Sequence, residues 1–358
     1  MTIAAFVYQG SPQRIVFGSG TLAKLADEAS RIKMKRALVL STPEQRERAE
    51  EVAGLLGDAC AAVFSEARMH TPVDVTDRAM AIVKAKGIDG TVAVGGGSTT
   101  GLGKAIAFRT DLPQIVVPTT YAGSEMTNIL GETVGGEKKT RRDAKIVPEV
   151  VVYDVDLTLT LPVMLSVTSG MNAMAHAVEG LYARDGNPVL SLMAEEGVRA
   201  LAAALPRIAI NAVDPEARAD ALYGAWLCGT VLAGTAMALH HKLCHVLGGS
   251  FDLPHAETHA VVLPHVVAYN TSAAPEAIAR VARALGVGDA AGGLFDLVRQ
   301  AGAPTSLRSL GMREDQLDRA ADIAVADPYW NPRPIERPAI RALLAHAWRG
   351  DRPEAAVS

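Results

Sequence analysis

The sequence predicts an α/β N-terminal domain, in which helices cover both faces of a parallel sheet behind an N-terminal hairpin, followed by an all-α C-terminal domain. Across residues 1–158, short β-type runs alternate with amphipathic helical segments, the rhythm typical of a parallel sheet. Across residues 159–358, Ala- and Leu-rich helical patterns dominate and β-branched runs almost disappear. A chain of 358 residues is long enough for two such domains.

The expected elements of the first domain follow one another at short intervals. Two short runs around Gly10-Ser11-Pro12 suggest a hairpin, and alternating strands and helices come after it. The hairpin strands are Phe6–Tyr8 and Arg14–Phe17; the later strands are Arg36–Leu40, Ala61–Phe64, Gly90–Val94 and Gln114–Pro118; the helices are Glu44–Leu56, Val75–Lys86 and Gly103–Phe108.

The second domain is predicted to be helical because apolar residues recur at helical spacing between Pro and Gly residues that begin or end each segment. The predicted helices are Leu161–Ala183, Pro188–Leu205, Pro215–Gly234, Pro275–Leu285 and Glu314–Ala324.

Composition excludes several classes of protein. A net charge of −4 gives no basic field for nucleic acid. The apolar runs stop well short of the ~20 residues that a membrane span requires. Three scattered cysteines, Cys60, Cys228 and Cys244, are too few for a disulfide framework and suit a reducing compartment. We therefore expect a cytoplasmic protein with a small-molecule ligand and neither nucleic-acid nor membrane partners.

A glycine-rich turn marks the first candidate site. The apolar run Thr91–Val94 leads into Gly95-Gly96-Gly97-Ser98-Thr99 and then into a helix. Gly96 and Gly97 let the backbone approach a pyrophosphate, Ser98 and Thr99 offer hydroxyls and amides, and the helix N-terminus attracts an anion. The turn follows a later strand, so it departs from the usual dinucleotide-binding arrangement.

A second hydroxyl-rich turn follows Gln114–Val117 and supplies further candidate cofactor contacts: Thr119, Thr120, Tyr121 and Ser124. Such turns gather at the carboxyl ends of parallel strands, where dinucleotides bind. Thr42, in Ser41-Thr42-Pro43, occupies the place where a carboxylate usually contacts the ribose. Without that carboxylate, discrimination against a 2′-phosphate should be weak, so NADH or NADPH is the expected cofactor of residues 1–158.

Histidines mark the second candidate site. On one predicted helix His241 and His245 lie one turn apart, with His255 shortly after, and on another Asn172 and His176 share the same spacing. Neutral imidazoles bind divalent metals and also transfer protons. An Asn and three His lack the carboxylate that divalent cations usually gain from.

The glycine turn, the Thr-Thr turn, Asn172 with His176, and the three later histidines occur in an order that resembles the iron-containing alcohol dehydrogenase superfamily over nearly the whole chain. The stretches Gly95–Ala107, Pro118–Thr127 and Gly170–Glu179 resemble its maleylacetate reductase branch. The resemblance implies NAD(P)H-dependent reduction of the C=C bond of maleylacetate to 3-oxoadipate, in the degradation of aromatic compounds. It also implies a homodimer and an all-helical catalytic domain across 159–358.

In the metal enzymes of this superfamily an Asp and three His hold the ion. His176, His241 and His255 match the three histidines, but Asn172 stands at the Asp position, so the resemblance implies no tightly bound metal. His245 matches the histidine that the family places near the nicotinamide.

The resemblance and the chemistry of an enone suggest a mechanism. Hydride attack on the alkene carbon β to the ketone would create an enolate. His241, His255 and His176 would stabilise this enolate as hydrogen-bond donors, and His245 would then donate the proton that completes the reduction. Lys242, Arg141 and Arg142 are candidates, on position alone, for binding the substrate carboxylates. A metal-dependent alcohol or polyol dehydrogenase and an NAD-using lyase of the dehydroquinate synthase type remain as alternatives.

Overall fold

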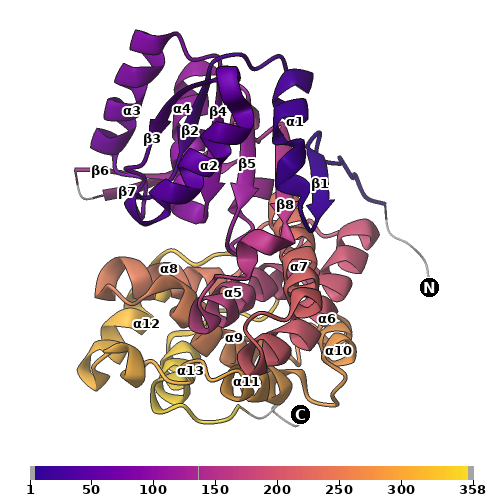
Figure 1. The fold of residues 1–358 in the computed structure, drawn as a ribbon. Coiled ribbons are helices and arrows are strands. Elements are labelled where there is room, and N and C mark those ends of the chain that lie inside the picture. Colours follow the sequence, from indigo (N-terminus) through magenta and orange to yellow (C-terminus); the bar gives the residue numbers. More distant parts are fainter. Residues whose placement is uncertain (1–4, 136, 354–358) are drawn as a thin grey trace. The chain divides into compact units, whose positions relative to one another are not determined.

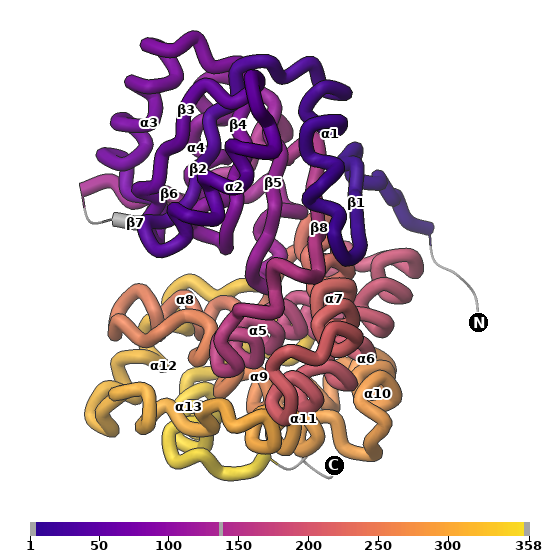
Figure 2. The backbone as a smooth tube through the Cα atoms, viewed as in Figure 1, coloured from indigo at the N-terminus to yellow at the C-terminus, as the bar shows by residue number. Residues whose placement is uncertain are grey.

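The computed structural model describes residues 5–135 and 137–353. The chain divides into two compact units: Gly10–Leu161, called here the α/β unit, and the region from Pro162 onward together with residues 5–9, called the helical unit. Figures 1 and 2 show the course of the chain in both, and each unit is described by itself.

The α/β unit contains a six-stranded sheet in the order β1-β8-β5-β4-β2-β3, with all neighbouring strands parallel (Figure 1). Four of these strands, β2, β4, β5 and β8, are buried along their whole length, as expected for a parallel sheet covered on both faces. The strands are β1 (Arg14–Gly18), β2 (Ala37–Leu40), β3 (Cys60–Phe64), β4 (Gly90–Gly95), β5 (Gln114–Pro118) and β8 (Val150–Asp154).

Helices cover both faces of this sheet. Successive strand residues point to opposite faces, so Val92 and Val94 pack with α1 and α2, whereas Ala93 packs with α3 and α4. The predicted α/β fold is therefore confirmed. The helices are α1 (Leu25–Arg31), α2 (Arg46–Leu56), α3 (Val73–Lys86) and α4 (Gly97–Thr110).

The predicted N-terminal hairpin is wrong. Phe6–Tyr8 forms no strand, and β1 pairs in parallel with β8, with Arg14 opposite Val150. Phe6, Val7 and Tyr8 remain substantially exposed, whereas the pairing with β8 buries Val16. The sequence alternation was correct for an edge strand, but it could not indicate that the partner lies 136 positions later (150 − 14).

Two further details of the α/β unit differ from the sequence prediction. Helix α4 begins at Gly97 rather than Gly103, because the glycines that suggested a loop form its first turns. An antiparallel pair that the sequence analysis did not predict, β6 (Ile129–Val134) and β7 (Glu137–Arg142), forms a separate two-stranded sheet. Its second strand is strongly charged, so hydrophobic periodicity could not reveal it.

The helical unit is all-α among the described residues, as predicted. Helix α5 lies at its centre: residues 166–180 are buried on every side, and α5 contacts α6, α7, α9 and α10. Helix α6 extends through Pro206 to Ile210, beyond the predicted end at Leu205. The helices are α5 (Val163–Leu181), α6 (Pro188–Ile210), α7 (Pro215–Gly234), α8 (Leu239–Phe251), α9 (His255–Asn270), α10 (Pro275–Leu285), α11 (Ala290–Gln300), α12 (Leu317–Ala326) and α13 (Arg337–Arg349).

Within the described part of the chain, no helix taken singly has the length and hydropathy needed to cross a bilayer; α7 and α8 reach that threshold only as a pair, with a 97° bend between them.

Candidate active site

The α/β unit gathers its candidate cofactor residues at one edge of the sheet. Strand β4 lies between β2 and β5, with Leu40 opposite Ala93 and Gly95 opposite Pro118. The turns that follow these three strands carry Thr42, then Gly96 and Gly97, then Thr119 and Thr120. The switch point of the sheet lies between β2 and β4, because the chain continues from β2 to β3 on one side and from β4 to β5 on the other. Such a switch point is where open α/β sheets bind nucleotides.

The glycine turn has the geometry of an anion site. At Gly95, φ is +149°, and a Cβ there would lie 2.5 Å from the Thr99 Oγ1 atom, so the turn requires glycine. A Cβ at Gly97 would meet nothing within 4 Å. No side chain caps the N-terminus of α4 at Gly96, which leaves the first amides of this 14-residue helix available to a phosphate.

Hydrogen bonds hold the neighbouring turns against the glycine turn. The Thr119 amide donates to the Gly95 carbonyl (3.0 Å), and Gln45 Nε2 donates to Thr119 Oγ1 (2.9 Å). Lys104, fully buried on α4, donates to Thr127 Oγ1 (2.9 Å) and to the Ile129 carbonyl (3.0 Å). Burial lowers the pKa of Lys104 to about 7.

The predicted cofactor residues differ in exposure. Gly97 is exposed, and Gly96, Ser98, Thr42, Thr120 and Ser124 are half-buried, so these positions can face a ligand. Thr119 is 5 % exposed, and the side chains of Thr99 and Tyr121 are fully buried. Those two side chains are therefore not accessible to a ligand.

The helical unit brings six histidines together from three helices. His176 comes from α5; His240, His241 and His245 from α8; His255 and His259 from α9. The ring of His241 lies 5.1 Å from His176, 5.0 Å from His259 and 6.2 Å from His245 between centroids, and His255 lies 4.5 Å from His259. The structure thus joins the four predicted histidines and adds His240 and His259.

Glu179, one turn after His176 on α5, fixes the ring of His241. Its buried carboxylate accepts hydrogen bonds from the amides of Ala238 (2.8 Å) and His240 (2.6 Å) and contacts His241 Nδ1 at 2.7 Å. An ionised carboxylate has no proton to donate, so its contact with His241 assigns the proton of the neutral ring to Nδ1. The Nε2 atom of His241 is buried and has no partner among the described residues.

His176 and Asn172 extend this arrangement along α5. The His176 ring stacks on His241 with an angle of 26° between the planes. Burial, reinforced by His241 and His255, holds the pKa of His176 well below its usual range, so this ring is neutral at pH 7. Asn172 lies one turn earlier, 7 % exposed, and its Oδ1 has no partner among the described residues. Buried polar atoms without a hydrogen-bond partner indicate a site that binds a polar ligand.

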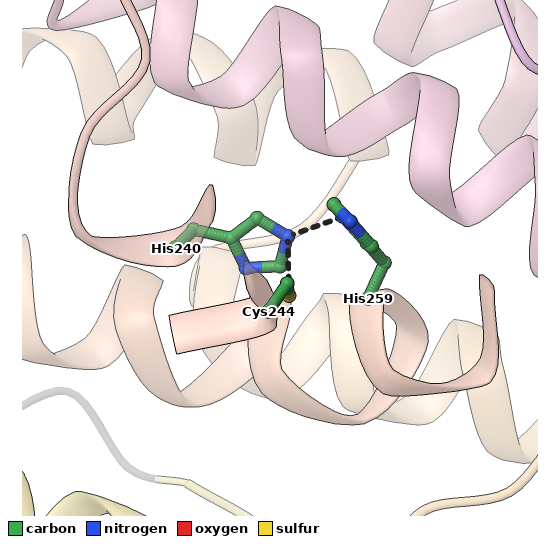
Figure 3. A group of neighbouring side chains, drawn as sticks. All are labelled: His240, Cys244 and His259. Atoms are coloured by element: carbon green, nitrogen blue, oxygen red, sulfur yellow. Dashed lines mark hydrogen bonds between the residues drawn. The ribbon is translucent and has the colours of Figure 1, made fainter. Parts of the chain in front are cut away.

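His240, His259 and Cys244 form a small buried group (Figure 3). The His241 ring lies 5.3 Å from the His240 ring between centroids. The His240 Nε2 atom lies 2.9 Å from His259 Nδ1 and 3.6 Å from Cys244 Sγ. Burial lowers the pKa of both rings well below the usual value, so one neutral ring donates to the other. The direct hydrogen bond accounts for the short nitrogen–nitrogen distance and ties the tautomer of His259 to that of His240.

Four residues of this cluster were missed or given no role by the sequence analysis: His240, Glu179, His259 and Tyr329. Glu179 is an acid inside an otherwise apolar helix, three positions after His176, and His259 lies four positions after His255, so spacing alone could have indicated both. Tyr329 lies in an irregular segment, and no sequence pattern connects it with α8. Its hydroxyl contacts His245 Nδ1 at 3.1 Å.

Comparison with known proteins identifies the family of this chain. Residues 12–155 match the family model described as "Iron-containing alcohol dehydrogenase", and residues 166–348 match "Fe-containing alcohol dehydrogenase family, C-terminal". The chain belongs to the iron-containing alcohol dehydrogenase family.

Within this family, the chain is similar to maleylacetate reductases. The chain is 58% identical to that of Rhizobium sp. (strain MTP-10005) and 56% identical to that of Burkholderia cepacia, in each case over 98% of this chain and 99% of the relative. The crystal structure of maleylacetate reductase from Agrobacterium tumefaciens superposes with a TM-score of 0.96 at 59% identity, covering 98% of this chain and 100% of the other.

A more distant member of the family shares the same fold. The iron-containing alcohol dehydrogenase from Corynebacterium glutamicum superposes with a TM-score of 0.95 at 42% identity, covering both chains completely. The resemblance to the iron-containing alcohol dehydrogenases, and to their maleylacetate reductase branch, is therefore confirmed.

Proposed function

We propose that this protein is an NAD(P)H-dependent maleylacetate reductase, which converts the C=C bond of maleylacetate to the single bond of 3-oxoadipate during the degradation of aromatic compounds. The observation that carries this proposal is the identity of 56–58% to maleylacetate reductases over nearly the entire chain. The polar cluster of the helical unit supplies groups suited to that reaction.

Maleylacetate is a conjugated enone with two carboxylates. When held by the α/β unit, NAD(P)H would supply the hydride that adds to the alkene carbon β to the ketone. Negative charge then accumulates on the ketone oxygen as an enolate, so the protein must stabilise an oxyanion and deliver one proton to the adjacent carbon. The uncapped N-terminus of α4 and the glycines before it support binding of the dinucleotide pyrophosphate.

Glu179 determines how His241 meets the enolate. With Nδ1–H donated to Glu179, a neutral His241 presents a lone pair at Nε2 and cannot donate from that atom. Donation to an oxyanion requires a second proton on the ring, whose positive charge the Glu179 carboxylate offsets. We therefore propose that His241, held by Glu179, faces the enolate and that His176, a neutral ring, is its partner. Asn172 lies one turn from His176, where an amide N–H could donate as well.

His245 is the proposed proton donor to carbon. It lies on the same face of α8 as His241, with 6.2 Å between ring centroids, and Tyr329 holds its Nδ1 atom. Burial raises the pKa of Tyr329, so its phenol stays protonated. The neutral hydroxyl can therefore orient the His245 ring through Nδ1. His255, at the first position of α9, lies beside His259 and is the last histidine of the cluster to be assigned.

The donor set does not fit a tightly held divalent metal. Asn172 stands where the metal enzymes of the family have an aspartate, which leaves an amide and three imidazoles without an anionic ligand. Glu179 cannot substitute, because both of its oxygens are already engaged by two amides and by His241. We therefore propose chemistry that depends on imidazoles and not on a resident ion.

Three further properties are proposed on the same basis. Either NADH or NADPH is the proposed cofactor: Ser41-Thr42-Pro43, directly after β2, contains no carboxylate, but the carboxylate of the next residue, Glu44, hydrogen-bonds to the Thr42 side chain. A homodimer and a cytoplasmic location stay predictions. Sedimentation of the purified protein tests the first, and fractionation of the producing cell tests the second.

The proposed function is tested by supplying maleylacetate with NADH and with NADPH. We expect loss of cofactor absorbance with at least one of them, and one equivalent of 3-oxoadipate per cofactor oxidised, identified by chromatography and mass spectrometry. Cofactor reduction with simple alcohols, dependent on added iron or zinc and without any reaction on maleylacetate, would identify a metal-dependent alcohol dehydrogenase instead.

A further inference from the structure

Lys242, between His241 and Cys244 on α8, is a cation in an unusual position. Its side chain is only 11% exposed. Its one anionic contact among the described residues is Asp327, at 3.8 Å, beyond hydrogen-bonding distance. Asp327 is itself 93% exposed, so water competes strongly for that carboxylate. A largely buried ammonium group normally has closer compensation than this.

Tyr329 connects Lys242 with the proposed proton donor. The Nζ atom of Lys242 lies 5.4 Å from the centroid of the Tyr329 ring, and the hydroxyl of the same ring contacts His245 Nδ1. Lys242 and His245 are three positions apart on α8 and so share one side of the helix. The ammonium group therefore belongs to the same polar constellation as His245, within the helical unit.

The other two basic candidates are engaged elsewhere. Arg141 lies 3.7 Å from the buried carboxylate of Glu132 and stacks over Phe108. Arg142 contacts the side chain of Asn128. Both arginines belong to β7 of the α/β unit, and these contacts compensate their charges without a substrate carboxylate.

From these contacts we infer that Lys242 binds a carboxylate of the substrate. The inference rests on the proposed function, which supplies a substrate with two carboxylates. A carboxylate at Nζ would provide the close counter-charge and the hydrogen-bond acceptor that Asp327 does not, and it would hold the enone beside His245 and Tyr329. An uncharged aldehyde or alcohol would leave the ammonium group without compensation, so Lys242 favours acidic substrates over neutral ones.

Lys242→Met tests this inference, because methionine keeps an apolar stem against Tyr329 and removes the charge. We expect the KM for maleylacetate to rise by about 10- to 100-fold, the range expected for losing a hydrogen bond to a charged group. The KM for NADH should stay within about twofold, and Lys242→Arg should restore part of the loss. Calorimetry adds a readout independent of turnover: the wild type should bind 3-oxoadipate more tightly than its dimethyl ester, and Lys242→Met should narrow that ratio.

Asp327→Asn is the matched control, since it removes the only described ionic partner of Lys242. An unchanged KM and an unchanged preference for 3-oxoadipate over its ester in Lys242→Met would overturn the inference, and so would an Asp327→Asn variant that loses as much as Lys242→Met. A wild-type enzyme active on maleylacetate beside an unaffected Lys242→Met variant refutes only the role of Lys242. A wild type inactive on maleylacetate refutes the proposed function and this inference together.

Discussion

The two candidate sites are built in opposite ways. In the α/β unit the site consists of backbone: Gly95 has a positive φ, Gly97 leaves open space, and no side chain caps the N-terminus of α4. In the helical unit the site consists of side chains, and its central ring, His241, is held by a carboxylate on another helix. The first site therefore depends on shape and the second on charge and hydrogen bonding. Substitutions that change charge without changing volume should therefore affect the site in the helical unit more than the site in the α/β unit.

Asn172→Asp should produce the largest effect, because it adds a negative charge to the side-chain site at almost constant volume. A new carboxylate opposes the developing enolate, and we expect activity without added metal to fall by ~100-fold, as for the loss of an oxyanion-stabilising group. Zinc or ferrous iron should bind more tightly than in the wild type and restore part of the rate. The affinity for NADH should not change. A variant with wild-type activity and metal affinity would show that Asn172 lies outside the reacting centre.

Glu179→Gln should lower kcat by about 10- to 100-fold, the usual cost of losing a partner that orients a functional histidine. An amide cannot accept all three hydrogen bonds that Glu179 accepts, so the proton on His241 Nδ1 is no longer specified. Glu132→Gln is the matched control, because Glu132 is also buried but pairs with Arg109 in the α/β unit. Equal losses of kcat in both variants would assign the effect of Glu179 to stability.

Gly97→Val should weaken NADH binding by at least about tenfold while leaving the fold intact, because a Cβ there meets nothing within 4 Å and the side chain would occupy the proposed place of the phosphate. The NADH dissociation constant follows from fluorescence titration. Gly54→Val, at another open glycine on α2 away from the turns, controls for the added bulk. Unchanged NADH affinity in Gly97→Val would remove the glycine turn from the cofactor site.

Acid should destabilise the helical unit before the α/β unit. Burial lowers the pKa of His265 to about 4 and holds those of His240 and His259 well below the usual value. The unfolded chain takes up these protons near pH 6.5 and the folded chain does not, so stability is full above pH 6.5 and falls as pH drops toward 4. The slope is ~1.4 kcal/mol per pH unit for each such histidine.

The α/β unit should respond differently because its buried acids have the opposite shift. Burial raises the pKa of Glu125 and of Glu149, so acidification protonates these carboxylates and removes the unfavourable free energy of burying their charge. Hydrogen exchange at pH 7 and pH 5, corrected for intrinsic rates, resolves the two units. Equal loss of protection in both units at pH 5 would contradict this difference.

Sequence predictability follows the same division. The glycine turn, its neighbouring strands and the Thr-Thr turn are contiguous in sequence, so their chemistry was visible before the fold. The histidine pairs were visible for the same reason, because i, i+4 spacing fixes a helix face. The dependence of His241 on Glu179, the approach of Tyr329 to His245 and the pairing of β1 with β8 each join segments far apart in the chain. Only tertiary packing decides such contacts, and local patterns carry no information about them.

The central claim is that the histidine cluster, without a resident metal, stabilises an enolate formed by hydride attack on the alkene. Its most direct test uses enzyme dialysed against EDTA, NADH deuterated at the transferred position, and maleylacetate. We predict undiminished activity, deuterium on the methylene next to the carboxylate, β to the ketone, and a solvent proton on the methylene next to the ketone. Deuterium on the carbonyl carbon, or activity that is lost with EDTA and returns with a divalent ion, would contradict the account.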